Sequence, residues 1–494
     1  MPYQDLREFV GFLESKGDLR RISAPVDPEL EITEIAHRML RADGPALLFE
    51  NVVGYDIPVL INLFCSNRRM NWALEVESAD ELAARLESMI DLVQGGPPSG
   101  IVNKLRTLGS LVHVGSYQPR TVNNAPCQEV VLTGDQVNLY DLPIIKCWPE
   151  DAGPYITLPL VITKDPETGT QNYGIYRMQV YDRCTTGMHW QTHKVGARHY
   201  RSSAERADDR LEVAVALGGD PASIWTGSAP LPPDIDEMVL AGFVRDRGVE
   251  LTPAKTVDLM VPAHAEIVLE GYVTPGEERT EGPFGDHTGY YSLAEPYPVF
   301  HVTTITRRRN PIYPTTFVGR PPTEDYWMGK VTERVFLPLI RLILPEVVDI
   351  NMPAEGIFHN LVLVSMKKEY PGQARKVIYG LWGLGLLSLT KVIVVVDDFV
   401  DVQNASEVAW RVANNINPGT DLIVVEGPID DLDVASPTPR FGSKLGIDAT
   451  RKGPEEGYRR EWPPDIEMSE DIRERVSRRW SELGLDEIVA PPGR

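Results

Sequence analysis

The chain has few cysteines, only four in 494 residues. No two of them have the C-x-x-C spacing that zinc ribbons and redox motifs use. Neither a disulfide framework nor a cysteine-bound structural zinc is therefore indicated, and a reducing compartment is expected. The four are Cys65, Cys127, Cys147 and Cys184.

Long apolar runs are also missing. No stretch reaches the roughly 18 uninterrupted apolar residues that a membrane-spanning helix needs. The start, MPYQDLREFV, lacks the basic and then apolar regions of a secretory signal. We expect a cytoplasmic protein. Peripheral contact with the inner face of the cell membrane, where a hydrophobic substrate could be collected, is an alternative that these features leave open.

Basic residues are in deficit, with 49 Lys and Arg against 71 Asp and Glu, a formal net charge of -22. Such a charge repels nucleic-acid phosphates and anionic membranes, so nucleic acid is not an expected partner. The 42% hydrophobic and 24% charged residues are typical of an ordered globular protein. The length exceeds one ordinary core, so two or three domains are expected.

Several common catalytic motifs are absent from the sequence. It contains no G-x-x-x-x-G-K-[ST], no G-x-G-x-x-G after a strand, no G-x-S-x-G and no H-E-x-x-H. The sequence therefore argues against the usual nucleotide-binding, serine-hydrolase and zincin chemistries.

What is present indicates three regions. In residues 1–115, apolar spacing predicts an amphipathic helix from Asp5 to Gly17, a second over 29–41 and a strand over 46–49. The loop-like GGPPSG at 95–100 closes this α/β unit.

The second region, 116–325, consists of short β-branched or apolar runs separated by glycine and proline, typical of an antiparallel barrel or sandwich. These runs are VVLTG, ITLPLVITK, GIYRMQVYD, LEVAVALGG, AEIVLEGYV and VFHVTTITR. In the third region, 326–494, helical and strand patterns alternate as in a layered α/β domain. We expect the polar tail beyond about 440 to extend over a partner surface.

One stretch, EGPFGDHTGYY at 281–291, is too rich in glycine for a helix. Gly282 and Gly285 permit turns that could bring Glu281 and Asp286 into the same space. Two nearby carboxylates resist simultaneous ionisation, so the pKa of one should be raised and it could hold a proton near neutral pH. A solvated acidic loop is the alternative interpretation.

Two further groups of residues could bind a metal ion. Asn172 opens an apolar strand that ends at Arg177, and HWQTHK follows at 189–194. Amide, imidazole and carboxylate ligands suit an ion of the magnesium or manganese kind. Hydrogen-bonded structural histidines are the alternative here. For the acids Asp234, Asp236 and Glu237 the alternative is a helix N-terminus.

Six segments together resemble the UbiD family of prenylated-flavin-dependent decarboxylases. They are NYGIYRMQV, CWPEDAGPYIT, SAEIVLEGY, EGPFGDHTGYY, GRPP and SKLGIDAT. The resemblance covers nearly the whole chain and is strongest to the bacterial members that act in ubiquinone synthesis. It implies an α/β (α+β) protein with an N-terminal α/β unit, a central split β-barrel that binds the flavin and a C-terminal α/β domain for dimerisation.

The resemblance also implies roles for particular residues. Arg177, Glu281 and Asp286 form the implied catalytic set, in which Asp286 is the proton donor. The implied manganese ligands are Asn172, His193 and Glu237, and a potassium ion is a further candidate. The implied contacts of prenylated FMN are Asn172, Ile175, Tyr176, Arg177, His189, Trp190, Gln191, Lys194 and Val195, with Lys391 as an additional phosphate contact.

The sequence departs from the ubiquinone enzymes at His189, where arginine is expected, and at Lys194-Val195, where Arg-Gly is expected. These departures put the substrate in doubt more than the reaction. The implied function is non-oxidative decarboxylation of 3-polyprenyl-4-hydroxybenzoate in ubiquinone biosynthesis. The alternatives are a hydroxybenzoate, naphthoate or heteroaromatic acid as substrate, or a flavin-binding protein without turnover. A flavin prenyltransferase as cofactor supplier and a homodimer or hexamer are implied as partners.

Overall fold

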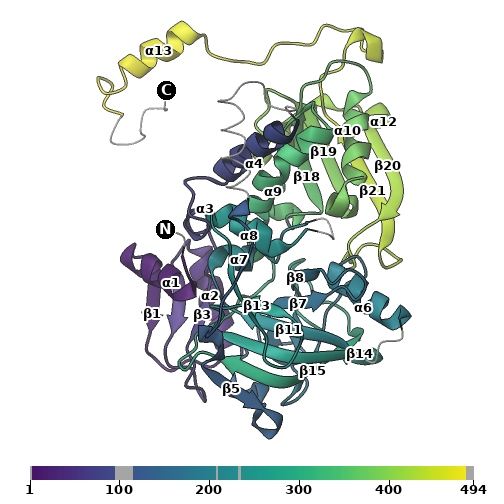
Figure 1. Ribbon diagram of the computed structural model, residues 1–494. Helices are drawn as coiled ribbons and strands as arrows, with labels where there is room; N and C mark the ends of the chain where they lie inside the picture. The colour runs from purple at the N-terminus through teal and green to yellow at the C-terminus, as the bar shows by residue number, and fades with distance from the viewer. Residues whose placement is uncertain (1–2, 95–114, 207–209, 232–234, 486–494) are drawn as a thin grey trace, which may run out of the picture. The chain divides into compact units, whose positions relative to one another are not determined.

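The computed structural model describes residues 3–94, 115–206, 210–231 and 235–485 (Figure 1). It consists of two units, Met1–Thr450 and Arg451–Arg494. The predicted loop at 95–100 and Asp234 lie outside the described residues. In the described ranges, no helix has the length and apolar character needed to cross a membrane.

The N-terminal helices and strand are present as predicted. Helix α1 (Leu6–Ser15) begins at Asp5, whose carboxylate accepts the N–H groups of Arg7 and Glu8, and its apolar face is buried. Strand β2 (Ala46–Phe49) lies inside a sheet of order β1-β2-β3-β16. The other elements of this sheet region are β1 (Leu19–Ile22), α2 (Glu31–Arg41), β3 (Val59–Ile61), α3 (Asn67–Ala73), α4 (Ala79–Gln94) and β16 (Tyr313–Pro314).

The central region contains a seven-stranded sheet in which β14 (Ile267–Glu281) and β15 (Glu295–Arg307) form a long antiparallel pair. The strand path is β10-β15-β14-β11-β7-β8, with β5 paired to β15. The other strands are β5 (Val130–Thr133), β7 (Leu160–Lys164), β8 (Gln171–Ile175), β10 (Thr185–Gly187) and β11 (Leu211–Leu217). Along the described chain this sheet does not close into a barrel.

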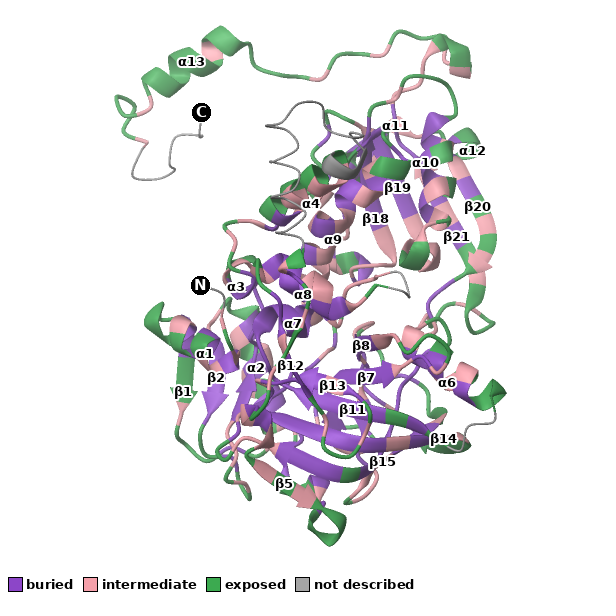
Figure 2. Ribbon diagram, in the orientation of Figure 1, coloured by how far each residue is buried: buried purple, intermediate pink, exposed green. Residues whose placement is uncertain are grey.

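The middle of this sheet is buried, as the purple of β7, β11 and the first part of β14 shows in Figure 2, whereas β5 and the later part of β14 contain exposed residues. Along β11, Val213 and Val215 belong to one apolar cluster and Ala214 and Ala216 to another. The run GIYRMQVYD, predicted as one strand, is interrupted at Tyr176 and Arg177 between β8 and β9. The smaller elements are β4 (Arg120–Thr121), β6 (Tyr155–Ile156), β9 (Met178–Gln179), α6 (Val195–Glu205), α7 (Pro221–Thr226), α8 (Glu237–Arg245), β12 (Glu250–Pro253) and β13 (Met260–Pro262).

The C-terminal region is a five-stranded sheet of order β17-β18-β19-β21-β20 with helices on both faces. Helices α9 and α10 cover one face and α11 the other, so the predicted layered α/β domain is confirmed. The elements are α9 (Glu324–Ile343), β17 (Val347–Asn351), β18 (Leu361–Met366), α10 (Gln373–Trp382), β19 (Val392–Asp397), α11 (Ala405–Asn415), α12 (Pro418–Asp421), β20 (Leu422–Pro428) and β21 (Phe441–Asp448).

The predicted tail beyond 440 is wrong for residues 441–448, because these form β21 between β19 and β20. The strand looks polar in sequence, yet Lys444 and Asp448 are buried. Gly446 lies so close to α10 that a Cβ there would be 2.8 Å from Ile378. The second unit, Arg451–Arg494, contains α13 (Glu470–Arg478). Its contact with a partner and the domain boundaries at 115 and 325 stay predictions.

Candidate active site

The stretch EGPFGDHTGYY turns back on itself directly after β14. Glu281 is the last residue of that strand, and Gly282 follows with φ of 94°, a left-handed conformation that favours glycine. The N–H of Asp286 donates to the carbonyl of Tyr290 at 3.0 Å, and Asp151 accepts the N–H of Gly285 at 2.7 Å. The prediction that this segment is not a helix and brings its two acids together is confirmed.

Arg177 joins the two acids. Its Nε donates to Glu281 Oε1 at 2.8 Å, and its Nη1 donates to Asp286 Oδ2. Nη2 donates to Ser292 Oγ at 3.2 Å, while the guanidinium lies 4.7 Å from the ring centre of Phe284. Glu281 is 1% exposed and Asp286 5% exposed, which excludes the alternative of a solvated acidic loop.

The electrostatics of these acids differ from the expectation. Burial acts to raise the pKa of Asp286, but Arg177 and then His287 outweigh it and hold that pKa below its usual range. Burial likewise opposes ionisation of Glu281, yet His189 and Arg177 lower its pKa. The predicted proton on one acid is therefore wrong for this state, because the shared cation compensates both charges.

Three residues at this site were not singled out from the sequence, namely Phe284, His287 and Ser292. Nδ1 of His287 lies 2.7 Å from Asp286 Oδ1, and that carboxylate raises the pKa of His287 against the effect of burial. All three lie in or directly beside the quoted stretch. Their proximity in sequence was the available signal, but their contact with Arg177 or Asp286 depends on the turn.

Gly285 sets the position of this loop against Trp148. A Cβ at Gly285 would lie 2.8 Å from Trp148 Cγ, well inside the distance that real side chains allow. We therefore expect Gly285→Ala to displace Asp286 and reduce turnover by at least about tenfold while the protein stays folded. Steady-state kinetics and circular dichroism check this. Gly453→Ala is the control, because a Cβ there would meet nothing within 4 Å.

Three buried polar atoms without a partner belong to Glu281 and to the adjacent residues His189 and Trp190. They are Glu281 Oε2, His189 Nε2 and Trp190 Nε1. Nδ1 of His189 lies 3.0 Å from Glu281 Oε1, so His189 contacts the same acid as Arg177 although it replaces the expected arginine. Three unpaired buried atoms in one region are unusual, and they fit a polar group that is not part of the chain.

A second set of predicted contacts gathers at the start of α6. Lys194 precedes the first helical residue, Val195, and the N–H of Gly196 lies 3.4 Å from Tyr176 Oη. A Cβ at Gly196 would be 2.6 Å from Trp190 Nε1, so this helix end approaches the unpaired indole. Free N–H groups at a helix N-terminus suit a phosphate group.

The other predicted cofactor contacts divide between this region and the C-terminal sheet. Gln191 is buried, and its carbonyl accepts the N–H of Lys194 at 3.0 Å. Ile175 ends β8 and packs on the N-terminal apolar cluster. Lys391 lies at the start of β19, where it forms a 2.6 Å ion pair with Asp433. Its contact with phosphate stays a prediction.

One predicted metal ligand, Glu237, contacts strand β8, which carries another, Asn172. Glu237 Oε2 accepts the N–H of Tyr173, the neighbour of Asn172, at 3.0 Å. Glu237 is the first residue of α8, as the alternative interpretation expected, yet it is buried, and burial raises its pKa to about 8. A buried carboxylate beside an amide fits a bound cation. His193 is exposed and forms no hydrogen bond or ion pair with Asn172 or Glu237 among the described residues.

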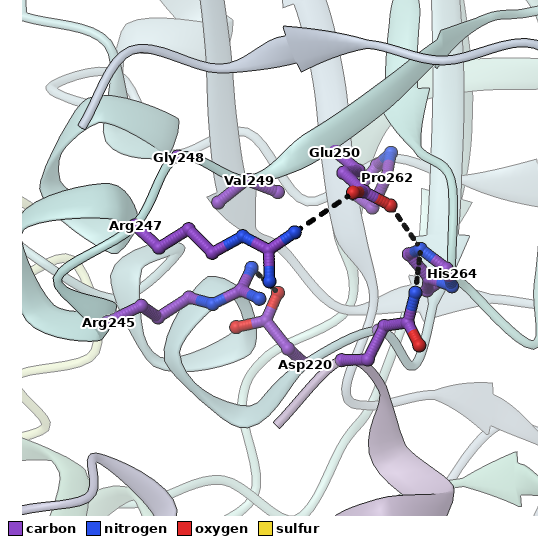
Figure 3. A pocket seen from close by; sticks show the side chains of 10 residues that line it. Asp220, Arg245, Arg247, Gly248, Val249, Glu250, Pro262 and His264 are labelled. Carbon is purple, nitrogen blue, oxygen red and sulfur yellow. Dashed lines mark hydrogen bonds and ion pairs between the residues drawn. The ribbon is translucent and has the colours of Figure 1, made fainter. Parts of the chain in front are cut away.

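A small hollow of about 20 Å³ lies elsewhere (Figure 3). Its charged side chains pair with one another: Arg245 with Asp220 at 3.0 Å, and Glu250 with His264 at 2.8 Å. None of the predicted site residues lines it. The hollow therefore has no part in the chemistry of Arg177.

Three family models cover most of the chain. They are described as the N-terminal, Rift-related and C-terminal domains of 3-octaprenyl-4-hydroxybenzoate carboxy-lyase, and they match residues 10–89, 120–321 and 326–449. An uncharacterized protein of Archaeoglobus fulgidus is 53% identical over 98% of this chain and 99% of its own length. One from Aquifex aeolicus is 50% identical over the same shares.

Solved structures agree with these matches. The UbiD-class enzyme HmfF from Pelotomaculum thermopropionicum, in complex with FMN, has a TM-score of 0.77 and 32% identity over 93% of this chain and 97% of that one. Vanillic acid decarboxylase from Sedimentibacter hydroxybenzoicus, in its closed form, has a TM-score of 0.84 and 29% identity over 98% and 99%. Sequence and structure together show that this chain belongs to the UbiD family of carboxy-lyases.

Proposed function

We propose that this enzyme removes carbon dioxide from an aromatic acid without net oxidation, using prenylated FMN, and that 3-polyprenyl-4-hydroxybenzoate is its first candidate substrate. The observation that carries the proposal is the buried Arg177, which contacts both Glu281 and Asp286 beside unpaired polar atoms. FMN and prenylated FMN occur in the structures of the relative HmfF, which supports a flavin here.

The chain offers separate places for the two ends of such a cofactor. His189, Trp190 and Glu281 present unpaired atoms to its ring, and the start of α6 with Lys194 presents N–H groups to its phosphate. When bound, the prenylated flavin would accept the electron pair that stays on the substrate carbon as carbon dioxide leaves.

Arg177 controls the charge of Asp286 in this proposal. A substrate carboxylate that binds Arg177 competes with Asp286 for the guanidinium. Once Arg177 binds the substrate instead, mainly His287 still opposes the burial that raises the pKa of Asp286, and the carboxyl group takes up a proton. Arg177 therefore orients the substrate, and its change of partner from Asp286 to the substrate carboxylate allows Asp286 to become protonated.

The proton balance is then complete. The bond between the ring carbon and the carboxyl carbon breaks, carbon dioxide departs and the electron pair remains with the ring carbon. Asp286 delivers its proton to that carbon, forming the new C–H bond, and regains a proton from solvent. Glu281, held by Arg177 and His189, stays ionised and keeps the guanidinium in place.

We further propose that Asn172, His193 and Glu237 bind manganese near the cofactor phosphate, with potassium as a possible second ion. In support of this set, Glu237 accepts the N–H of Tyr173, the residue next to Asn172, and His193 would complete it. We expect Glu237→Ala to lower bound manganese and flavin together, because the ion offsets phosphate charge in an acidic protein. Metal analysis and flavin absorbance of protein coexpressed with a flavin prenyltransferase measure both contents.

The exposed Glu278→Ala serves as the control for that variant. It should retain both manganese and flavin. Full retention of both in Glu237→Ala would place the metal elsewhere and contradict this assignment.

The substrate is tested on the enzyme matured with a flavin prenyltransferase. It is offered 3-polyprenyl-4-hydroxybenzoates, vanillate and other hydroxybenzoates, naphthoates and heteroaromatic acids, and carbon dioxide release is measured. A small phenolic acid is the second candidate, because vanillic acid decarboxylase has a TM-score of 0.84 against this chain. A matured flavoprotein that turns over none of these acids would support flavin binding without catalysis. Chromatography with light scattering tests the proposed homodimer or hexamer.

A further inference from the structure

Two histidines and an aspartate beside the active site have no part in the proposed decarboxylation. His287 follows Asp286 in the loop after β14, His359 lies just before β18, and Asp430 lies just after β20. One ligand atom from each lies within 4.8 Å of the other two. We refer to these three residues as the His-His-Asp cluster.

The orientation of each side chain directs a ligand atom to the same place. Nε2 of His287 lies 3.2 Å from Nε2 of His359, and Nε2 of His359 lies 3.9 Å from Asp430 Oδ2. The other carboxylate oxygen of Asp430 accepts the N–H of Leu432 at 2.8 Å, so Oδ2 remains for the cluster. The three atoms therefore converge without competing backbone contacts.

The second nitrogen of His287 strengthens this interpretation. Its Nδ1 donates to Asp286 Oδ1 at 2.7 Å, which leaves Nε2 as the atom that faces His359. A carboxylate that fixes the tautomer of a histidine in this way is a common feature of metal sites. Two nitrogens bound to one tetrahedral zinc at about 2.0–2.1 Å lie about 3.3–3.4 Å apart, close to the separation of the two Nε2 atoms.

The surroundings favour a positive charge at this point. Two carboxylates lie beside the imidazoles: Asp286 Oδ1 is 2.7 Å from Nδ1 of His287, and Asp430 Oδ2 is 3.9 Å from Nε2 of His359. The two imidazoles would repel each other if both nitrogens presented lone pairs, so a proton or a metal ion must lie between them. Lys194 supplies an opposing positive charge near Asp430.

The backbone before His359 is held in an uncommon conformation. Ile357 and Phe358 have φ of 46° and 51°, in the left-handed region that a β-branched residue rarely adopts. The Phe358 ring lies 5.5 Å from the ring of His287 and 5.3 Å from that of His359. Backbone strain of this kind clusters at functional sites, and here it aims His359 at the loop of Asp286.

We propose that the His-His-Asp cluster binds a divalent transition-metal ion such as Zn²⁺, at a site distinct from Asn172 and Glu237. Two imidazoles and a carboxylate are the ligands of an open zinc site, in which a fourth position is left for water or an added ligand. The ion would fasten the loop that carries Asp286 to the C-terminal sheet. It would also keep the Nδ1–H of His287 directed at Asp286.

The test measures metal binding and needs no substrate or flavin. Full-length protein is treated with a chelator, titrated with Co²⁺ while the visible absorbance of tetrahedral cobalt is followed, and then competed with Zn²⁺. We expect wild-type protein to bind one more equivalent than His359→Ala or Asp430→Asn. Asp286→Asn should weaken binding about 10- to 100-fold, because Asp286 orients a ligand without binding the ion.

Two variants serve as controls. His301→Ala removes a histidine that pairs with Glu277 and stacks on Tyr272, outside the cluster, and the variant should bind the ion like the wild type. Glu237→Ala should keep this equivalent, because that residue belongs to the proposed manganese site. Circular dichroism shows that the variants are folded, and the isosteric Asp430→Asn replaces His359→Ala if the latter is not. Equal stoichiometry and affinity in the wild type and the folded cluster variants would overturn the proposal, whatever the outcome of the decarboxylation assays.

Discussion

Asp286→Asn is expected to reduce decarboxylation by roughly 100- to 10,000-fold, the usual contribution of a positioned general acid. Asparagine has nearly the shape of aspartate and can still face Arg177, but it has no carboxyl group that could carry the proton to the ring carbon. We expect the fold and the flavin content to be unchanged. Turnover of the matured enzyme and exchange of solvent deuterium into the decarboxylated product measure the two parts of this loss.

Asp258→Asn is the matched control, because Asp258 is an exposed aspartate that pairs with Lys164. It should leave both turnover and exchange at the level of the wild type. Turnover unchanged in Asp286→Asn would remove Asp286 from its proposed role. Loss of exchange together with loss of flavin would instead indicate that the substitution disturbs cofactor binding.

Arg177→Ala is expected to destabilise the protein at neutral pH by about 3–5 kcal/mol, the usual result of breaking a buried ion pair from one side. The side chain of Arg177 is 10% exposed, and both of its acidic partners are almost fully buried. Removing the guanidinium leaves two buried carboxylates without a counter-charge. Urea unfolding of the wild type and the variant, followed by fluorescence, measures the difference.

Arg177→Ala should also reverse the direction in which Asp286 changes the stability of the folded protein as the pH falls. In the wild type the pKa of Asp286 is lowered, so its contribution is fully present above the unfolded pKa of about 4 and is lost as the pH falls. In the variant, burial raises that pKa, and the folded state gains stability as the carboxyl group takes up a proton. The difference in the free energy of unfolding between wild type and Arg177→Ala should therefore be largest near neutral pH and decrease toward pH 5.

Arg279→Ala is the control for this experiment. Arg279 is half-exposed and lies 3.8 Å from Asp182, a surface pair that contributes about 0–1 kcal/mol. A pH-independent difference between Arg177→Ala and the wild type would contradict the proposed compensation of charge.

The sequence predicted some features of the candidate site and not others. Arg177, Glu281 and Asp286 could be chosen from motifs, because their residue types and order are written in the sequence. His189 could be placed near the cofactor, but its contact with Glu281 could not be foreseen. The raised pKa predicted for one of the two acids was wrong, because Arg177 contacts both carboxylates and lowers the pKa of each.

The fold shows the same division. The apolar spacing of α1 and the β-branched run of β19 identified both elements, because one buried face or a wholly buried strand leaves a regular pattern. Strand β21 was missed because its glycines and its buried Lys444 give no such pattern. Its membership of the sheet depends on hydrogen bonds to β19 and β20, which come from other parts of the chain.

The sequence by itself determined the family, many of the helices and strands, and the three residues that we propose for catalysis, Arg177, Glu281 and Asp286. Only the tertiary structure decided that one guanidinium contacts two acids and that His287 meets His359 and Asp430. The physical reason is that residue types and local periodicity are properties of short segments. Distances between charges, and hence their protonation, arise only when segments far apart in the chain pack together.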